Sequence, residues 1–140
     1  MIIGLGTDLC DIGRVTRALA RFPGRFENRL YTEREQARAE RRPAKRAARY
    51  AQMFAAKEAC SKALGTGLRK GVFWRDMEVV PLASGKPTLR LTGGARARMR
   101  ALTPDGMEAR IEVSLSDESG LANAVVIIFA VAATTLDRGE

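Results

Sequence analysis

The chain contains no histidine and only two cysteines, and aromatic residues make up just 6% of it. The lack of histidine excludes a histidine-based catalytic triad and a zinc site with imidazole ligands. Cys10 and Cys60 lie far apart without a metal-binding spacing, so we expect two reduced thiols that pack in the interior.

Long apolar runs are also missing, and no stretch is long enough to cross a bilayer. The first residues carry no basic region and already include Asp8, so we do not expect a signal peptide. We expect a cytoplasmic protein without membrane association. Its length of 140 residues suggests a single domain over residues 1–140, large enough to bury a core.

Positive charge is concentrated in the first half of the chain, which has a net charge of +8 overall. Residues 1–70 hold 16 Lys and Arg against 7 Asp and Glu, whereas residues 71–140 hold 8 against 9. This excess favours an acidic partner, which by charge alone is a nucleic acid, a phosphorylated small molecule or an acidic protein. The alternative, that the arginines only solvate helix surfaces, explains some of them but not their one-sided distribution.

The sequence pattern predicts an α+β fold, with helices concentrated in the N-terminal half and a mostly antiparallel sheet in the C-terminal half. The apolar run over residues 2–9 predicts a buried strand that joins this sheet, and the almost wholly apolar run over 122–132 predicts its central strand. Residues after 132 are expected to be loose. The other expected elements are helices over 12–22, 26–30, 32–42, 44–64 and 95–102, strands over 77–80, 88–91 and 109–116, and a turn over 117–120.

Helix start and stop signals support these boundaries. Asp11 can cap the first helix, and Thr32 with Glu35 forms a capping box for the third. Pro43 suits the start of the long helix, and Gly65 suits its end. Four arginines at spacings of three and four are expected to share one side of the first helix: Arg14, Arg17, Arg21 and Arg25.

Three acidic and basic residues are candidates for a catalytic site. Glu58 and Lys62 lie four residues apart on the long helix, although an ordinary surface ion pair worth ~0.3–0.5 kcal/mol explains this spacing equally simply. Asp8 lies near the end of the first strand, where a buried carboxylate needs a cation, a helix N-terminus or a metal. Asp8 with Glu58 would suit Mg²⁺ bound to a phosphate ester, but sequence spacing does not show that the two meet.

The segment after the long helix, Gly65-Thr66-Gly67 followed by Arg69 and Lys70, has features of a phosphate-binding loop. Glycines allow a close backbone approach, and the cations add favourable charge. It is not a P-loop, because the glycines follow the helix instead of preceding it. The alternative is a simple glycine stop, which Gly65 provides alone.

Five blocks of sequence, taken together and in order, resemble the holo-[acyl-carrier-protein] synthases, the small bacterial 4′-phosphopantetheinyl transferases. FAAKEACSKALGTG is the most specific of them, and the resemblance covers essentially the whole chain. The blocks are IGLGTDLCDI at 3–12, FAAKEACSKALGTG at 54–67, DMEV at 76–79, SGKPTL at 84–89 and VSLSD at 113–117.

This resemblance implies the family fold and a Mg²⁺-dependent transfer of the 4′-phosphopantetheine group from coenzyme A to a serine of apo acyl carrier protein. The other product would be adenosine 3′,5′-bisphosphate, and the activity would support fatty acid biosynthesis. The family is typically trimeric, with each active site between two subunits. Because acyl carrier proteins are acidic, the arginine row at 14, 17, 21 and 25 is expected to dock the carrier.

The resemblance also implies site residues. The metal ligands would be Asp8 and Glu58, while Lys62 could stabilise the pyrophosphate. The serine proton could pass to Glu58 through a metal-held water, or to Asp117, and both candidates stay open. The residues expected to line the coenzyme A cleft are Lys57, Ser61, Lys62, Gly65, Thr66, Gly67, Lys86, Pro87 and Asp117.

Two positions depart from the family pattern. Met53 stands where many members have an arginine, and Arg49 one turn earlier is a candidate replacement. Asp117 stands where many have a histidine, which puts a negative charge at that position at neutral pH. A basic RNA-binding module and a non-catalytic family member are the rival hypotheses. The scarcity of aromatics argues against the first, and the intact Asp8, Glu58 and Lys62 argue against the second.

Overall fold

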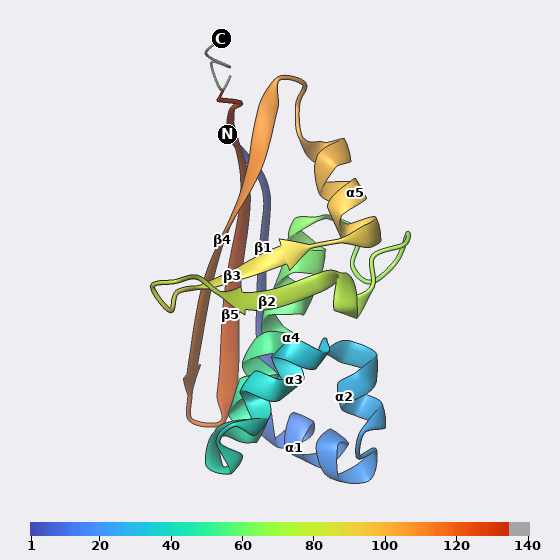
Figure 1. Ribbon diagram of the computed structural model, residues 1–140, viewed down its shortest axis with the longest axis vertical. Coiled ribbons are helices and arrows are strands. Elements are labelled where there is room, and N and C mark those ends of the chain that lie inside the picture. Colours follow the sequence, from blue (N-terminus) through green and yellow to red (C-terminus); the bar gives the residue numbers. More distant parts are fainter. Residues whose placement is uncertain (135–140) are drawn as a thin grey trace.

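The computed structural model describes residues 1–134, so only part of the tail expected to be loose lies within the described residues. It has the predicted α+β architecture, with helices gathered mainly in the N-terminal half (Figure 1). In chain order the elements are β1 (Ile2–Asp11), α1 (Ile12–Arg21), α2 (Arg25–Leu30), α3 (Glu33–Glu40), a 3₁₀ turn (Pro43–Lys45), α4 (Arg46–Ala63), a second 3₁₀ turn (Trp74–Asp76), β2 (Met77–Pro81), β3 (Pro87–Leu91), α5 (Gly93–Leu102), β4 (Met107–Glu118) and β5 (Leu121–Ala132).

The strands form two separate antiparallel sheets instead of the one sheet expected. The larger has the order β1–β5–β4, so β5 is central as predicted and β1 joins it as an edge strand. Strands β4 and β5 form a hairpin closed by Ser119 and Gly120, which both have positive φ. This two-residue turn is shorter than the expected turn over 117–120, because a primed turn matches the twist of long strands. Strands β2 and β3 pair only with each other and cross the larger sheet (Figure 1).

The expectation that the first strand is buried is wrong for one of its faces. Leu5 is 60% exposed and Leu9 66% exposed, while Gly6 and Cys10, which alternate with them, are buried. Alternating residues of a strand point to opposite faces, and α4 covers only the face that carries Gly6. The apolar run therefore reflects one packed face and one open face.

Two glycines allow α4 to lie unusually close to β1. A Cβ atom added to Gly4 would lie 2.1 Å from the Ala63 carbonyl oxygen, and one added to Gly6 would lie 1.8 Å from the Ala59 carbonyl oxygen. No side chain fits at either position, so the helix backbone packs directly on the strand backbone. This face of α4 carries the small residues Ala55, Ala59 and Ala63, all of which are buried.

The predicted caps are present where the helices begin. The Asp11 carboxylate accepts a hydrogen bond from the Gly13 amide at 2.8 Å, and Thr32 forms the expected capping box with Glu35. Pro43 opens a short 3₁₀ turn that leads into α4. Helices α1, α2 and α3 lie together at one end of the sheet, with α5 near the other (Figure 1). Within residues 1–134, none of the helices has both the length and the apolar character that crossing a bilayer requires.

Candidate active site

Asp8, Glu58 and Lys62 come together at the junction of β1 and α4, although Asp8 lies 50 residues before Glu58 and 54 before Lys62 in sequence. The Lys62 ammonium lies 3.2 Å from the Asp8 carboxylate and donates to the Thr7 carbonyl at 2.9 Å. Asp8 and Glu58 both line a cavity of about 380 Å³. We call these three residues the carboxylate corner.

The close packing of α4 on β1 explains why the corner forms. Gly6 contacts the backbone of Ala59, and Asp8 follows Gly6 by two residues on the same face of the strand. Glu58 precedes Ala59 by one residue, so the helix presents it beside Asp8. The two glycines of the first strand therefore set the distance between the carboxylate groups.

The Asp8 charge opposes the ionisation of Glu58. Partial burial raises the pKa of Glu58, the nearby Asp8 charge raises it further, and Lys62 lowers it. A divalent cation placed between the carboxylates would remove this repulsion. The described part of the chain holds no group of three or more metal-ligating side chains, so a metal here would take its remaining ligands from water and substrate. That donor set of two carboxylates suits Mg²⁺ bound to a phosphate substrate.

Cys10 also lines the cavity, but it is a poor nucleophile. Burial raises its pKa to about 11, and the Asp8 charge adds to the effect. The side chain is therefore a neutral thiol near pH 7, and thiolate chemistry is disfavoured. Both cysteines are free and buried, as the sequence analysis predicted.

The predicted loop after α4 has an unusual backbone. Gly65 and Gly67 have positive φ, at 76° and 59°. The Gly67 amide donates back to the Ser61 carbonyl, and the Thr66 hydroxyl donates to the Gly67 carbonyl at 2.8 Å. Ser61 itself is buried, and its hydroxyl donates to the Glu58 carbonyl at 2.7 Å. Ser61 therefore ties the segment to Glu58, while Gly65 is exposed and Thr66 and Gly67 are half-buried.

Lys57 does not line a cleft, contrary to the sequence-based expectation. Its side chain has no exposed surface and pairs with Glu35 at 2.8 Å. Successive residues of a helix differ in direction by about 100°, so Lys57 points into the interior while Glu58 faces the cavity. Sequence alone did not identify Glu35 as its partner.

The remaining predicted coenzyme A residues lie elsewhere in the same chain. Asp117 accepts a hydrogen bond from Gln52 at 2.6 Å, and Lys86 pairs with Glu112. Pro87 lines a second cavity of about 370 Å³, which shares no lining residue with the cavity of the carboxylate corner. The structure thus brings together only part of the predicted set.

Met53, the unexpected residue of the helix motif, lines this second cavity beside a group of arginines. It is buried, and the Arg49 guanidinium next to it donates to the Arg38 carbonyl at 2.9 Å. Arg38 in turn donates to the Val79 carbonyl. The lining arginines are Arg38, Arg41 and Arg49. Positive charge is therefore present around Met53.

The arginine row is divided between two helices. Arg14 lines the cavity of the carboxylate corner, and Arg17 with Arg21 borders an adjoining shallow hollow along α1. Arg25 is the first residue of α2, because Pro23 and Gly24 end the first helix before it. The expectation that all four share one helix is therefore wrong for Arg25.

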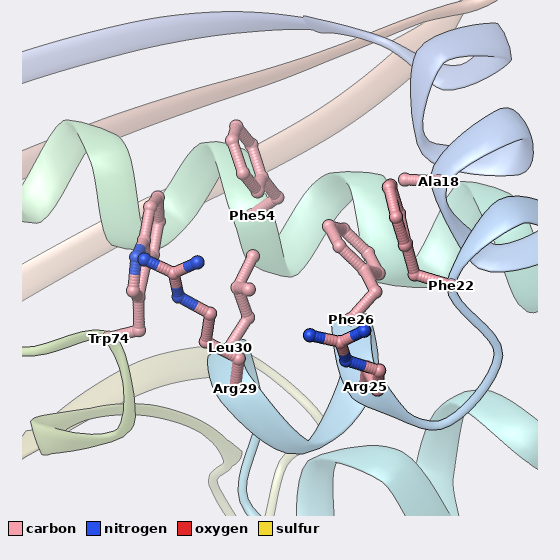
Figure 2. A pocket seen from close by; sticks show the side chains of 8 residues that line it. All are labelled: Ala18, Phe22, Arg25, Phe26, Arg29, Leu30, Phe54 and Trp74. Atoms are coloured by element: carbon pink, nitrogen blue, oxygen red, sulfur yellow. The ribbon is translucent and has the colours of Figure 1, made fainter.

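An apolar pocket beside the corner was not expected from the sequence. Figure 2 shows aromatic side chains from four segments around it, with two arginines at the same opening. Its volume is about 470 Å³, and it shares three residues with the carboxylate cavity: Ala18, Phe26 and Phe54. The other lining residues are Phe22, Arg25, Arg29, Leu30 and Trp74. Phe54 was expected only as a core residue, and nothing in the local pattern links it to Trp74, on which it stacks with ring centroids 5.1 Å apart.

Comparison with known proteins agrees with the geometry. The family model of the 4′-phosphopantetheinyl transferase superfamily matches residues 4–114. A holo-[acyl-carrier-protein] synthase of Methylobacterium nodulans is 62% identical over 128 residues, which are 91% of this chain and 96% of the relative. One of Bradyrhizobium diazoefficiens is 60% identical over 134 residues, covering 94% of this chain and 96% of the relative.

Solved structures show the same fold. The Neisseria meningitidis holo-[acyl-carrier-protein] synthase matches with a TM-score of 0.80 and 32% identity, covering 92% of this chain and 99% of that chain. The Helicobacter pylori enzyme in complex with coenzyme A matches with a TM-score of 0.75 and 26% identity, covering 89% of this chain and 99% of that chain. The chain is therefore an enzyme of the 4′-phosphopantetheinyl transferase superfamily and belongs to its holo-[acyl-carrier-protein] synthases.

Proposed function

We propose that this enzyme transfers the 4′-phosphopantetheine group of coenzyme A to a serine of an acidic apo acyl carrier protein. The observation that carries the proposal is the carboxylate corner, in a chain similar to enzymes solved with coenzyme A. In the reaction, the serine oxygen forms a bond to the phosphorus of the transferred group. The phosphorus–oxygen bond to adenosine 3′,5′-bisphosphate breaks, and the serine loses its proton.

Asp8 and Glu58 are the residues that would hold Mg²⁺. The repulsion that contributes to the raised pKa of Glu58 supports this assignment, because a cation would relieve it. When bound, the metal would supply positive charge to the phosphate oxygens. Lys62, whose side chain is 52% exposed and pairs with Asp8, would supply a second positive charge beside that carboxylate.

Two groups were candidates to accept the serine proton. Glu58 lines the cavity, and burial raises its pKa, which makes it a stronger base than an ordinary carboxylate. Asp117 pairs with Gln52 outside this cavity. Within one chain, Glu58 is therefore the favoured proton acceptor.

The arginine row and the apolar pocket together suit an acidic carrier. Arg14, Arg17 and Arg21 are exposed, and Arg25 lies at the opening of the pocket (Figure 2). Rim charges of this kind speed the approach of an oppositely charged partner, and apolar contacts then hold it. The pocket adjoins the cavity of Glu58, so a carrier seated there would present its serine to the corner.

We further propose a single catalytic domain that assembles as a homotrimer with active sites between subunits. The open face of β1, with Leu5 and Leu9 exposed, supports such an assembly because it offers apolar surface to a neighbour. The second cavity, with Pro87 and its arginines, would then serve the nucleotide of coenzyme A bound at a neighbouring corner. A cytoplasmic location and a role in fatty acid biosynthesis complete the proposal.

A direct assay tests the transfer. The purified protein is incubated with coenzyme A, Mg²⁺ and an apo acyl carrier protein, and the carrier is weighed by mass spectrometry. We expect the carrier to gain the mass of one phosphopantetheine group, and the gain to disappear when Mg²⁺ is chelated. An unchanged carrier mass with folded protein would refute the proposed function.

A further inference from the structure

The buried Lys57 has no part in the chemistry proposed above, yet its contacts are complete. Its ammonium donates to the Glu35 carboxylate at 2.8 Å, to the Trp74 carbonyl at 3.0 Å and to the Met77 carbonyl at 2.7 Å. An ammonium has three donors, and each has one partner here. The side chain joins α4 to the turn and strand that follow the Gly65 loop.

Glu35 completes the same network from α3. Its carboxylate accepts hydrogen bonds from the Thr32 amide at 2.9 Å and from the Val79 amide at 3.0 Å. Both side chains of the ion pair are 0% exposed. Apolar residues of similar volume often stabilise a fold as well as a buried ion pair does, so burial alone does not explain the pair. An apolar side chain at position 57, however, could not bind the two carbonyls.

Those carbonyls belong to the segment that carries the only tryptophan of the chain. Trp74 is attached to α4 at two points, since its carbonyl binds Lys57 and its indole stacks on Phe54 with an interplanar angle of 29°. Phe54 lies three residues before Lys57, which is less than one helical turn. The indole forms one wall of the apolar pocket in Figure 2.

We propose that Lys57 is a positioning residue: held by Glu35, it fixes the Trp74 wall of the apolar pocket and thereby sets how tightly the carrier protein is bound. The inference rests on the proposed function in that the pocket receives the carrier. The three hydrogen-bond partners of Lys57 line neither the cavity of the carboxylate corner nor the second cavity. Its loss therefore acts on carrier binding and leaves coenzyme A binding nearly unchanged.

The test compares Lys57→Met with Lys62→Met, the same substitution five residues further along the helix. Lys57→Met removes the ammonium but keeps an unbranched side chain. We expect the fluorescence of Trp74 to move to longer wavelength, acrylamide quenching to increase, and the KM for the carrier to rise about tenfold, as loss of a charge-assisted hydrogen bond implies. The kcat and the KM for coenzyme A should change little. Lys62→Met should lower kcat and leave the Trp74 fluorescence unaltered.

A second variant keeps the inference testable if Lys57→Met does not fold. Trp74→Ala removes the wall itself but leaves the backbone carbonyl to Lys57, and it should raise the KM for the carrier with kcat retained. An unchanged carrier KM in folded Trp74→Ala or Lys57→Met would overturn the inference, as would unchanged Trp74 fluorescence in Lys57→Met. If the wild-type protein transfers nothing, the proposed function fails, and the fluorescence comparison still decides whether Lys57 positions Trp74.

Discussion

Helix α4 carries two lysine–carboxylate pairs with opposite properties. Lys57 and Glu35 are fully buried, and every donor of the ammonium has a protein partner. In the second pair, Asp8 lines a cavity and the Lys62 side chain is 52% exposed. The Asp8 charge also raises the pKa of the nearby Glu58. The first pair has no capacity left for a ligand, whereas the second has both charge and access.

The difference teaches that residue type and spacing alone do not identify a functional charge. Lys57 and Glu58 are adjacent in the motif, yet the helix turns one into the interior and the other toward the cavity. The buried Lys57 ammonium makes all its hydrogen bonds within the protein. Partial burial and the like charge of Asp8 raise the pKa of Glu58. We call Lys62 with Asp8 the open pair and Lys57 with Glu35 the closed pair. The open pair should control catalysis, and the closed pair should control the shape of the neighbouring surface.

The largest expected effect comes from neutralising one of the two carboxylates of the carboxylate corner. Glu58→Gln or Asp8→Asn removes a proposed metal ligand at constant volume and should lower kcat on the order of 10³-fold, because the site loses several kcal/mol of charge stabilisation. Initial rates of carrier modification at saturating substrates measure the loss. Thermal unfolding of Glu58→Gln without Mg²⁺ should show no destabilisation, since this substitution removes the repulsion between Glu58 and Asp8. A variant that keeps more than a tenth of the activity would contradict these roles.

A smaller loss of activity should follow from a substitution that separates α4 from β1. Gly6→Ala places a methyl group against the Ala59 carbonyl, so the helix must move away from the strand. We expect destabilisation of about 1–3 kcal/mol from overpacking and a roughly 10²-fold loss of activity from misplacement of Glu58. Chemical denaturation and rate measurements test both parts.

Gly106→Ala is the control for backbone effects, because nothing lies within 4 Å of its added Cβ. Its positive φ of 77° should cost stability, but activity per folded molecule should stay at the wild-type level. Full activity in folded Gly6→Ala would show that close packing does not set the geometry of the corner.

Charge reversal along α1 should chiefly weaken the encounter with the carrier. In the double variant Arg14→Glu and Arg21→Glu, we expect the KM for the carrier to rise on the order of tenfold, with coenzyme A binding nearly unchanged. High salt should narrow the difference, because it screens exposed charges. Arg100→Glu on α5 is the matched control. If the double variant and Arg100→Glu have the same KM for the carrier, the arginine row only solvates the helix.

Much of the fold was predictable because its signals are local. Asp11, Thr32 and Gly65 mark helix ends through contacts within a few residues. The alternation in β4 and the apolar run of β5 each lie within a single strand. The carboxylate corner was predicted only through the family pattern. It depends on the approach of α4 to β1, and no spacing rule reports a contact between Gly6 and Ala59.

The wrong predictions also arise from contacts between segments that are distant in sequence. Lys57 was expected in a cleft from the family resemblance, whereas the structure pairs it with Glu35, which lies 22 residues away on another helix. The exposure of Leu5 depends on which face of the sheet α4 covers, and that is a property of the assembled elements. The wall formed by Trp74 likewise depends on contacts between distant segments.

The smallest expected effect concerns the pH dependence of stability. Burial opposes ionisation of Glu78, but hydrogen bonds from Thr32 and Arg90 outweigh it and lower its pKa below the usual 4.5. Ionised Glu78 therefore stabilises the fold above pH 4.5, and this contribution is lost as the pH falls through its lowered pKa. Glu78→Gln should cost about 1 kcal/mol near pH 7 and progressively less in acid, measured by urea denaturation across pH. A cost that does not vary with pH would contradict this account.

The central claim, that the open pair serves catalysis and the closed pair serves carrier binding, is tested most directly by one comparison. Carrier mass gain is followed over time for Glu58→Gln and Lys57→Met, at equal concentrations of folded protein and at saturating carrier. We predict that Glu58→Gln gives almost no gain, while Lys57→Met approaches the wild-type rate. Near-wild-type transfer by Glu58→Gln, or a loss in Lys57→Met that saturating carrier does not restore, would contradict the claim.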